Sequence, residues 1–127
     1  MANDTTRTND LKKLIQTQLK TLTTNVFFEN ATDDKLYPHI VFNFRTIDLG
    51  DLWRQDYILE IDVWDKKNST YDVDELSDKV EDLLQAKNLP QTRVLPTFYK
   101  IDRKSIYDSD KSIKHRLIRF QIQNYVK

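Results

Sequence analysis

The chain has 127 residues, of which 39% are hydrophobic and 31% are charged, and its formal net charge at pH 7 is zero. This length predicts a single domain with a core of its own, and the absence of cysteine excludes disulfides and thiolate metal sites. The single glycine, Gly50, excludes glycine-rich phosphate-binding loops. The lack of a basic excess argues against sequence-specific binding of nucleic acid.

The N-terminal region is expected to contain a disordered tail followed by a helix. Residues 1–8 are polar and have no apolar run, so they are not a signal peptide and are expected to be disordered, whereas residues 9–127 are expected to form a single α+β domain. No stretch approaches the roughly 20 apolar residues of a membrane span, so no membrane partner is expected. A helix is predicted from about Asn9 to Leu22 because apolar residues recur there at helical spacing. They are Leu11, Leu14, Ile15, Leu19 and Leu22.

Two strands are predicted after this helix. Residues 23–29 become β-branched and aromatic, which is typical of a short strand. In residues 40–46 an inward set, Ile40, Phe42 and Phe44, alternates with a second set that ends in Arg45. Residues 47–55 form a connection that carries Trp53. This tryptophan either contacts a partner, because aromatic residues are enriched at interfaces, or folds back onto the sheet edge, and the sequence leaves both readings open.

The clearest strand in the chain covers residues 57–65. Alternate positions are all apolar and predict a face turned to the core: Tyr57, Leu59, Ile61 and Val63. The other face is polar in the middle and ends in a large aromatic residue: Ile58, Glu60, Asp62 and Trp64. This second face is available either for catalysis or for contact with a partner.

A helix and two more strands complete the predicted fold. Residues 72–87 are predicted to form a helix, with acidic residues in its first turn and an apolar stripe along one side. After a connector at residues 92–96, a weaker strand is predicted over residues 98–106, with Tyr99 and Ile101 on one side and Lys100 and Asp102 on the other. A long strand is predicted over residues 113–126. The fold class is therefore α+β, a mostly antiparallel sheet of four to five strands with two helices on one face, in the order α-β-β-β-α-β-β.

The zero net charge hides a separation of charge along the chain. Residues 29–86 contain 15 acidic and 6 basic residues, a net charge of −9, whereas residues 87–127 contain 10 basic and 3 acidic residues, a net charge of +7. The simpler interpretation is that folding brings the two blocks together inside one subunit. The alternative is two oppositely charged surfaces, which would suit a head-to-tail oligomer.

No pattern in the sequence predicts an established kind of catalytic site. The two histidines have no second ligand at helix or hairpin spacing, so neither a metal nor any other cofactor is expected. Asp65 and Lys67 resemble the acid and lysine of metal-dependent nucleases, which would need a further acid such as Asp51 or Asp56.

Glu60 and Asp62 lie two positions apart on one strand face and could form a general acid/base pair. The interpretation we favour is cross-strand pairing of these acids with the arginines on the other strands, namely Arg45, Arg116 and Arg119.

Four segments in order carry a family resemblance. They are Tyr-Pro-His-Ile-Val-Phe at residues 37–42, Leu-Glu-Ile-Asp-Val-Trp-Asp at 59–65, an acid-capped helix that ends in Asp-Leu-Leu at 82–84, and Arg-Leu-Ile-Arg-Phe-Gln-Ile at 116–122. Over roughly residues 10–126 this order resembles the tail completion, or tail terminator, proteins of long-tailed bacteriophages. Trp53 and the first eight residues have no counterpart in the pattern.

The resemblance implies a structural, non-enzymatic virion protein that is assembled in the host bacterial cytoplasm. It implies a homo-hexameric ring at the head-proximal end of the tail tube, which stops tail growth and contacts the tail tube protein and the head-completion or connector protein. The matched positions in the Asp-Val-Trp motif are Asp62 and Trp64. Together with the residue patterns it gives these candidates for subunit or partner contacts: Arg45, Trp53, Glu60, Asp62, Trp64, Arg116 and Arg119.

Three other functions stay open from the sequence. The first is another neck or head–tail adaptor protein of the same virion, because such proteins are of similar size. The second is a metal-dependent nuclease that uses Asp65 and Lys67. The third is a generic cytoplasmic binding module.

Overall fold

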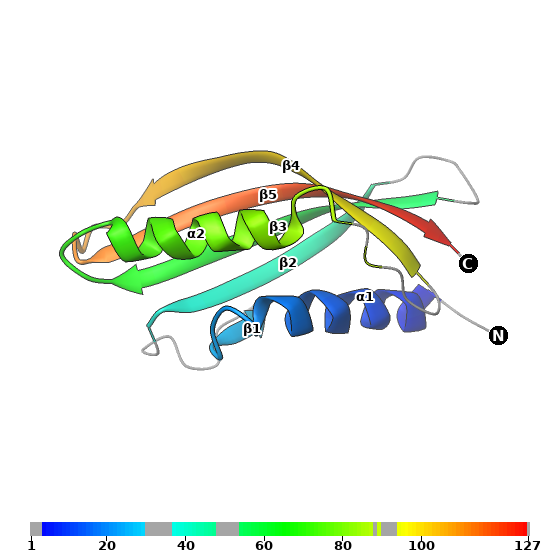
Figure 1. Cartoon of the computed structure of the whole chain (residues 1–127), viewed down its shortest axis with the longest axis horizontal. Helices are drawn as coiled ribbons and strands as arrows, with labels where there is room; N and C mark the ends of the chain where they lie inside the picture. Colours follow the sequence, from blue (N-terminus) through cyan, green and yellow to red (C-terminus); the bar gives the residue numbers. More distant parts are fainter. Residues whose placement is uncertain (1–3, 30–36, 48–53, 88, 90–93, 127) are drawn as a thin grey trace.

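The computed structural model describes residues 4–29, 37–47, 54–87, 89 and 94–126 (Figure 1). In this part of the chain two helices and five strands follow one another in the predicted order, which confirms the α+β class. The elements are α1 (Asp4–Leu19), β1 (Val26–Phe28), β2 (His39–Ile47), β3 (Arg54–Lys66), α2 (Tyr71–Leu84), β4 (Val94–Tyr107) and β5 (Ile113–Val126).

The five strands form one sheet in the order β1-β2-β3-β5-β4. β1 pairs with β2 in parallel, and all the other neighbours are antiparallel, so the sheet is mostly antiparallel as predicted. β3 lies in the middle, where it pairs with β2 on one side and with β5 along 13 consecutive positions on the other. The strand with the clearest alternation is therefore the centre of the sheet.

Both helices lie on the same face of the sheet and bury one shared core (Figure 1). The apolar stripes of α1 and α2 pack against the inward set of β3, all four of whose members are buried as predicted. In β5 the inward set is Ile118, Phe120 and Ile122, each fully buried. Burial of apolar surface on this single face is the main stabilising contribution to the fold.

The first helix begins earlier than the sequence analysis predicts. α1 starts at Asp4, so residues 4–8 of the tail expected to be disordered are helical, while residues 1–3 lie outside the described part. The apolar spacing that predicts the helix begins only at Leu11, so the polar residues 4–8 gave no sign of it. The helix ends at Leu19 because the Thr21 hydroxyl donates a hydrogen bond to the Gln18 carbonyl, 2.6 Å away, and so competes with further helical turns. That residues 9–127 form one domain stays a prediction.

β4 is longer and less regular than predicted. It begins at Val94, inside the expected connector, because it pairs with β5 from that point onward. A β-bulge between Lys100 and Asp102 shifts the register, so that Tyr99 and Asp102 share one face and the predicted pairing of Lys100 with Asp102 on one side is wrong. The segment after α2 runs along the outer edge of β4 and forms two backbone hydrogen bonds with Phe98. Ala86 N–H donates to Phe98 O (2.7 Å), and Phe98 N–H donates to Lys87 O (3.1 Å).

Among the described residues, no helix is long and apolar enough to cross a membrane.

Candidate functional site

Both described helices leave the opposite face of the sheet uncovered, and we call this the open face. The strand register defines it, because residues that pair across strands point to the same side of a sheet. Its central rows contain Val41, Asn43 and Arg45 of β2, Ile58, Glu60, Asp62 and Trp64 of β3, His115, Leu117, Arg119 and Gln121 of β5, and Tyr99, Asp102, Lys104 and Ile106 of β4.

An aromatic stack crosses one end of the open face. Trp64 lies between His39 and His115, its direct neighbours in the register, with ring centroids 5.9 Å and 3.6 Å apart and interplanar angles of 18°. The Nε2 atom of His115 lies 2.6 Å from Asp62 Oδ1, which fixes the imidazole on the indole. Both histidines are buried, so the stack is a rigid platform within the sheet face.

In the middle of the open face Arg119 and Asp102 form an ion pair within the chain. The Arg119 guanidinium donates two hydrogen bonds to Asp102, with distances of 2.8 and 2.5 Å, and Glu60 lies directly opposite Arg119 in the register. These hydrogen bonds hold the pKa of the Asp102 carboxyl below its usual range. Arg119 is therefore paired across strands, but with Asp102 and not with Glu60 or Asp62 as predicted.

At the far end of the open face, Asp56 is completely buried although no described helix covers it. Burial alone would raise the pKa of its carboxyl, but hydrogen bonds from Arg54 (2.7 Å to each oxygen) and from Gln121 (2.8 Å) outweigh burial, and the pKa lies below its usual range. Asp56 is thus a satisfied structural carboxylate.

The predicted contact residues fall into three groups. Glu60, Asp62, Trp64, Arg119 and Arg45 come together on the open face. Arg116 does not join them, because it pairs with Val63 in the register and so points to the helix-covered face, where its Nε donates to Asp74 Oδ1 at 2.8 Å. Trp53 lies outside the described residues.

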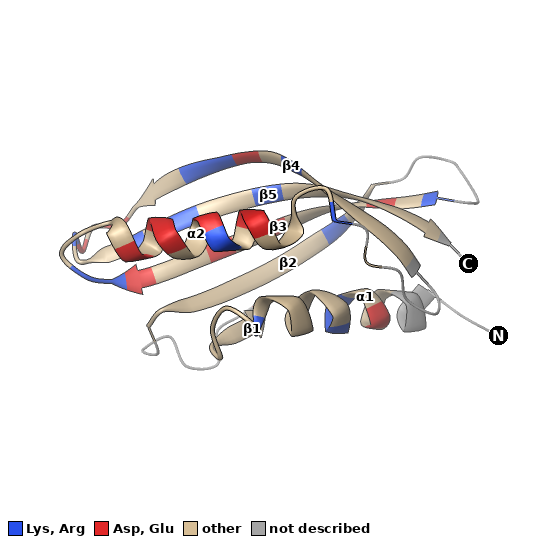
Figure 2. Ribbon diagram, viewed as in Figure 1, with Lys and Arg blue, Asp and Glu red and all other residues tan. Residues whose placement is uncertain are grey.

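The two charge blocks of the sequence meet inside one subunit (Figure 2). Arg103 of β4 lies 3.1 Å from Asp74, 2.6 Å from Asp78 and 2.5 Å from Glu81, all on α2, and Lys100 also pairs with Glu81. The interpretation in which folding brings the blocks together is confirmed for these residues. The charge separation therefore gives little support to a head-to-tail oligomer.

The residues proposed for a nuclease are not brought together. Asp65 and Asp56 lie nine positions apart on β3, about 30 Å at the usual rise per strand residue, and an odd number of positions places them on opposite faces. Asp51 lies outside the described residues, and within the described ranges no group of three or more His, Asp or Glu side chains is placed to hold a metal ion. Lys67 instead pairs with Asp72 at the start of α2.

The histidine–tryptophan stack was not predicted from the sequence. In the sequence, His39 and His115 stand near the starts of predicted strands, and no pattern there indicates that they stack with Trp64. The missing information was the register, because only the pairing of β2, β3 and β5 puts both rings beside Trp64.

Comparisons with known proteins agree with the architecture. Among solved structures, a chain from "Virion of native gene transfer agent (GTA) particle" is similar to this one with a TM-score of 0.71 and 12% sequence identity, over 87% of this chain and 91% of that chain. At this identity the likeness shows the fold alone. No curated protein matches the sequence. The sequence profile described as Tail completion protein gp17 matches residues 14–123, most of the chain, and the protein therefore belongs to this tail completion family.

Proposed function

We propose that this phage tail structural protein forms a ring at the head-proximal end of the tail tube, where it ends tail growth and joins the tail to the head connector. Family membership supports a location in the tail of the virion. The ring, its six-fold symmetry and its position at that end of the tail are the parts that we propose. The protein acts by binding and carries out no chemical step.

The observation that carries the proposal is the open face. It exposes apolar surface, and several of its polar side chains are engaged within the chain, since Arg119 pairs with Asp102 and the His115 ring is hydrogen-bonded to Asp62. A partner can cover the Arg119–Asp102 pair without leaving an unpaired buried charge there, which would be costly. The stacked Trp64 supplies a large aromatic surface of the type that dominates the energetics of interfaces.

The proposed partners are further copies of this chain, the tail tube protein and the head-completion or connector protein. We assign the contact between subunits to the part of the open face around Glu60, Asp62, Trp64 and Arg119, with Arg45 at its margin. Arg116 is not included, because its guanidinium is engaged by Asp74 on the other face. In this assignment the open face is one half of the contact, and the neighbouring subunit supplies a different surface.

Reversing charges on the open face tests the proposal. We expect Glu60→Lys and Arg119→Glu to shift the protein from a ring toward monomers in size-exclusion chromatography with light scattering, because each change leaves a charge unpaired inside the contact. Lys87→Glu is the matched control, since Lys87 is exposed and follows α2 on the other side of the molecule. If both open-face variants assemble like the unaltered protein, this face is not the subunit contact.

The second test concerns tail growth. Tail tube protein that polymerises in the presence of this chain should give tubes that stop elongating once the chain has bound to one end. Electron microscopy would measure their lengths with and without the protein. Tubes of unchanged length and free ends would contradict the proposed role as a terminator.

A further inference from the structure

We infer that a groove on the helix side of the sheet binds Lys104 from the open face of a second copy, so that the ring grows by packing the open face of each subunit against the helix layer of the next. This inference rests on the proposed ring and names the second half of the subunit contact. The helix layer here means α1 and α2.

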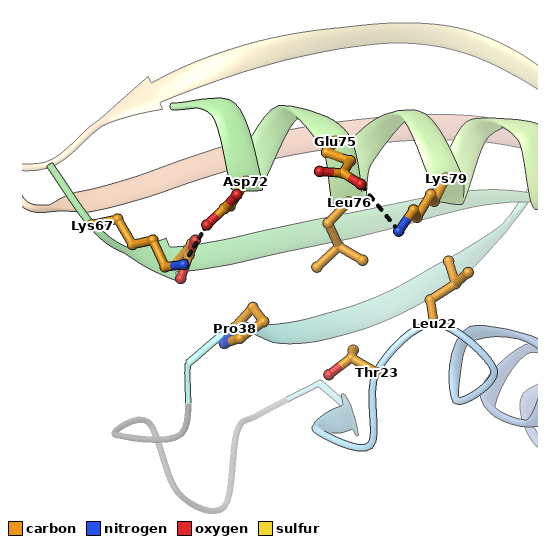
Figure 3. Close-up of a pocket in the computed structure, with 9 residues that line it drawn as sticks. Leu22, Thr23, Pro38, Lys67, Asp72, Glu75, Leu76 and Lys79 are labelled. Atoms are coloured by element: carbon orange, nitrogen blue, oxygen red, sulfur yellow. Dashed lines mark hydrogen bonds and ion pairs between the residues drawn. The ribbon is translucent and has the colours of Figure 1, made fainter. Parts of the chain in front are cut away.

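The groove lies between α2 and the segments that carry Leu22 and Pro38 (Figure 3). It has a volume of about 240 Å³. Leu76 points from α2 into this space, and together with Leu22 and Pro38 it gives the groove an apolar lining. Along α2 the rim is formed by two ion pairs, Lys67 with Asp72 and Glu75 with Lys79.

One lining residue, Asp65, is a nearly buried carboxylate that has no ion pair of its own in the described part of the chain. Only 3% of the residue is exposed, and it lines the groove from the end of β3. Among the described residues its only hydrogen bond comes from the backbone N–H of Lys66, 2.8 Å from Oδ1, and no cation lies within ion-pair distance of it. The neighbouring Lys67 acts on Asp65 electrostatically but forms its ion pair with Asp72.

A nearly buried carboxylate that forms no ion pair is stabilised by the arrival of a further cationic side chain. Asp65 lines an opening that solvent and a partner can reach, so the cation can come from another chain. The groove also carries one more acidic than basic side chain among its lining residues, which favours a positively charged occupant. A lysine is suitable because its long aliphatic stem packs along apolar surface while its ammonium group reaches the acid.

Lys104 has the properties that this groove requires. It is exposed on the open face, and among the described residues it makes no hydrogen bond or ion pair, although Asp102 is near enough to act on it electrostatically. Leu117 lies opposite Lys104, and Ile106 occupies the next position of β4 on the same face, so the lysine has apolar neighbours on two sides and Asp102 on a third. The open face thus presents a lysine with apolar neighbours, and the helix side presents an acid with apolar neighbours.

The positions of the two sites suit a closed ring. A cyclic assembly joins two different surfaces of neighbouring subunits, and the open face and the helix layer are opposite sides of this two-layer molecule (Figure 1). In the strand register Lys104 lies opposite Leu117, and Leu117 lies opposite Asp62. Asp65 is three residues farther along β3, so Lys104 and Asp65 are separated by about 10 Å in the direction of the strands. When the ring axis runs along the strands, the lysine of one subunit and the groove of the next therefore lie at nearly the same level.

Mixing two variants tests this inference. Asp65→Asn removes the charge of the groove with little change in shape, and Lys104→Glu reverses the charge of the open face. We expect each variant alone to be mainly monomeric, with a self-association constant at least ten-fold lower than that of the unaltered protein in analytical ultracentrifugation. An equal mixture should form heterodimers, because Lys104 of the Asp65→Asn variant can enter the intact groove of the Lys104→Glu variant. These heterodimers should grow no further, because the remaining groove and the remaining open face are the altered ones.

Further variants guard against loss of folding. Circular dichroism and urea unfolding check each variant, and Glu75→Lys supplies a charge change at the exposed rim of the same groove that should also weaken association. Lys87→Glu, which lies beyond the C-terminal end of α2 and does not line the groove or the open face, should assemble normally.

The outcomes separate this inference from the proposed function. If the unaltered protein forms rings and both variants do so too, the groove pairing is wrong and the ring stands. If each variant is monomeric but the mixture yields no heterodimer, Lys104 and the groove are not partners. If the unaltered protein never assembles, alone or on tail tubes, the ring and this inference both fall.

Discussion

Arg103 joins more partners than any other side chain in the charged network between α2 and the sheet. Its guanidinium reaches Asp74, Asp78 and Glu81, which lie at helical spacing along one side of α2. Arg116 also binds Asp74, so two arginines from neighbouring strands hold the helix onto the sheet. At the residue scale, the basic block of the sequence therefore serves to fix the acidic helix.

Replacing Arg103 by Gln should lower the free energy of unfolding by about 1–3 kcal/mol, because several charge-assisted hydrogen bonds are lost at once. Urea unfolding followed by circular dichroism measures the change. Lys79→Ala is the matched control, since its pair with Glu75 is exposed and spans one turn of a helix. That control should cost less than about 0.5 kcal/mol. Equal effects of the two changes would show that the network adds nothing beyond surface charge.

Asp74 predicts how stability depends on pH. Burial alone would raise the pKa of its carboxyl, but Arg116 and Arg103 outweigh burial and lower the pKa below its usual range. A group whose pKa is lower in the folded state stabilises the fold above its unfolded pKa of about 4, and this contribution is lost as the pH falls through the folded value. The free energy of unfolding should therefore decrease below about pH 4.

The Asp74→Asn variant should be less stable than the unaltered protein at pH 7 and should lose less stability on acidification. Urea unfolding of both proteins at pH 7 and pH 3 tests this difference. A parallel decrease in the two proteins would mean that Asp74 does not contribute to the acid sensitivity.

At the residue scale, the sequence predicts which face of a strand a residue occupies when that residue is apolar and buried. It does not predict the face of a charged residue whose position depends on a partner distant in sequence. The inward set of β3 followed from its alternation alone. The predicted pairing of Arg116 with Glu60 or Asp62 is wrong, because the alternation through Ile118 and Phe120 places Arg116 on the core side. Its charge suggested a solvent-facing position, and only the acids of α2, distant in sequence, explain why an arginine is stable there.

At the element scale, β3 has two faces with different tasks. Ile61→Ala should cost about 2–5 kcal/mol of stability, because Ile61 is fully buried beneath the helices. Ile58, on the open face, is only partly buried, so Ile58→Ala should cost less in a monomer and should weaken assembly instead. Urea unfolding and light scattering on both variants separate the two effects. Equal losses of stability would contradict the assignment of one face to the core and the other to a partner.

The end of α2 offers a second prediction at this scale. Ala86 follows the helix with φ of 56°, a left-handed conformation that costs little only for glycine, and its N–H donates to Phe98 O of β4. Ala86→Gly should therefore stabilise the protein by about 0.5–1 kcal/mol. Thermal unfolding measures this, with Ala86→Val as the opposite control. A lower melting temperature for the glycine variant would contradict the assigned backbone conformation.

Elements were predictable from the sequence in proportion to their regularity. The order of all seven followed from apolar periodicity, and β5 was predicted with the bounds that the structure has. The predicted alternation of side chains in β4 is wrong after Lys100, because a β-bulge there shifts the following residues to the opposite face. No residue type in the sequence marks the position of the bulge. The pairing that lengthens β4 is with β5, and no local pattern specifies the register between two strands.

At the scale of the whole molecule, the fold is asymmetric. One side of the sheet carries the helix layer and the charged network, and the other is the open face with its stacked Trp64. The family profile places the chain among tail completion proteins, and the proposed ring would use the two sides of this architecture for contacts with different neighbours. The sequence indicated the family through the order of its segments, but not which surfaces meet, because the charges that suggested oppositely charged surfaces are in large part paired between α2 and the sheet.

The central claim, a ring at the head-proximal end of the tail, is tested most directly by electron microscopy of purified tails and virions labelled with an antibody against this chain. We predict label at a single site per tail, at the end that joins the head, and six-fold symmetry when images of that end are averaged. Label along the tube, at the distal tip or on the head side of the connector would contradict this account.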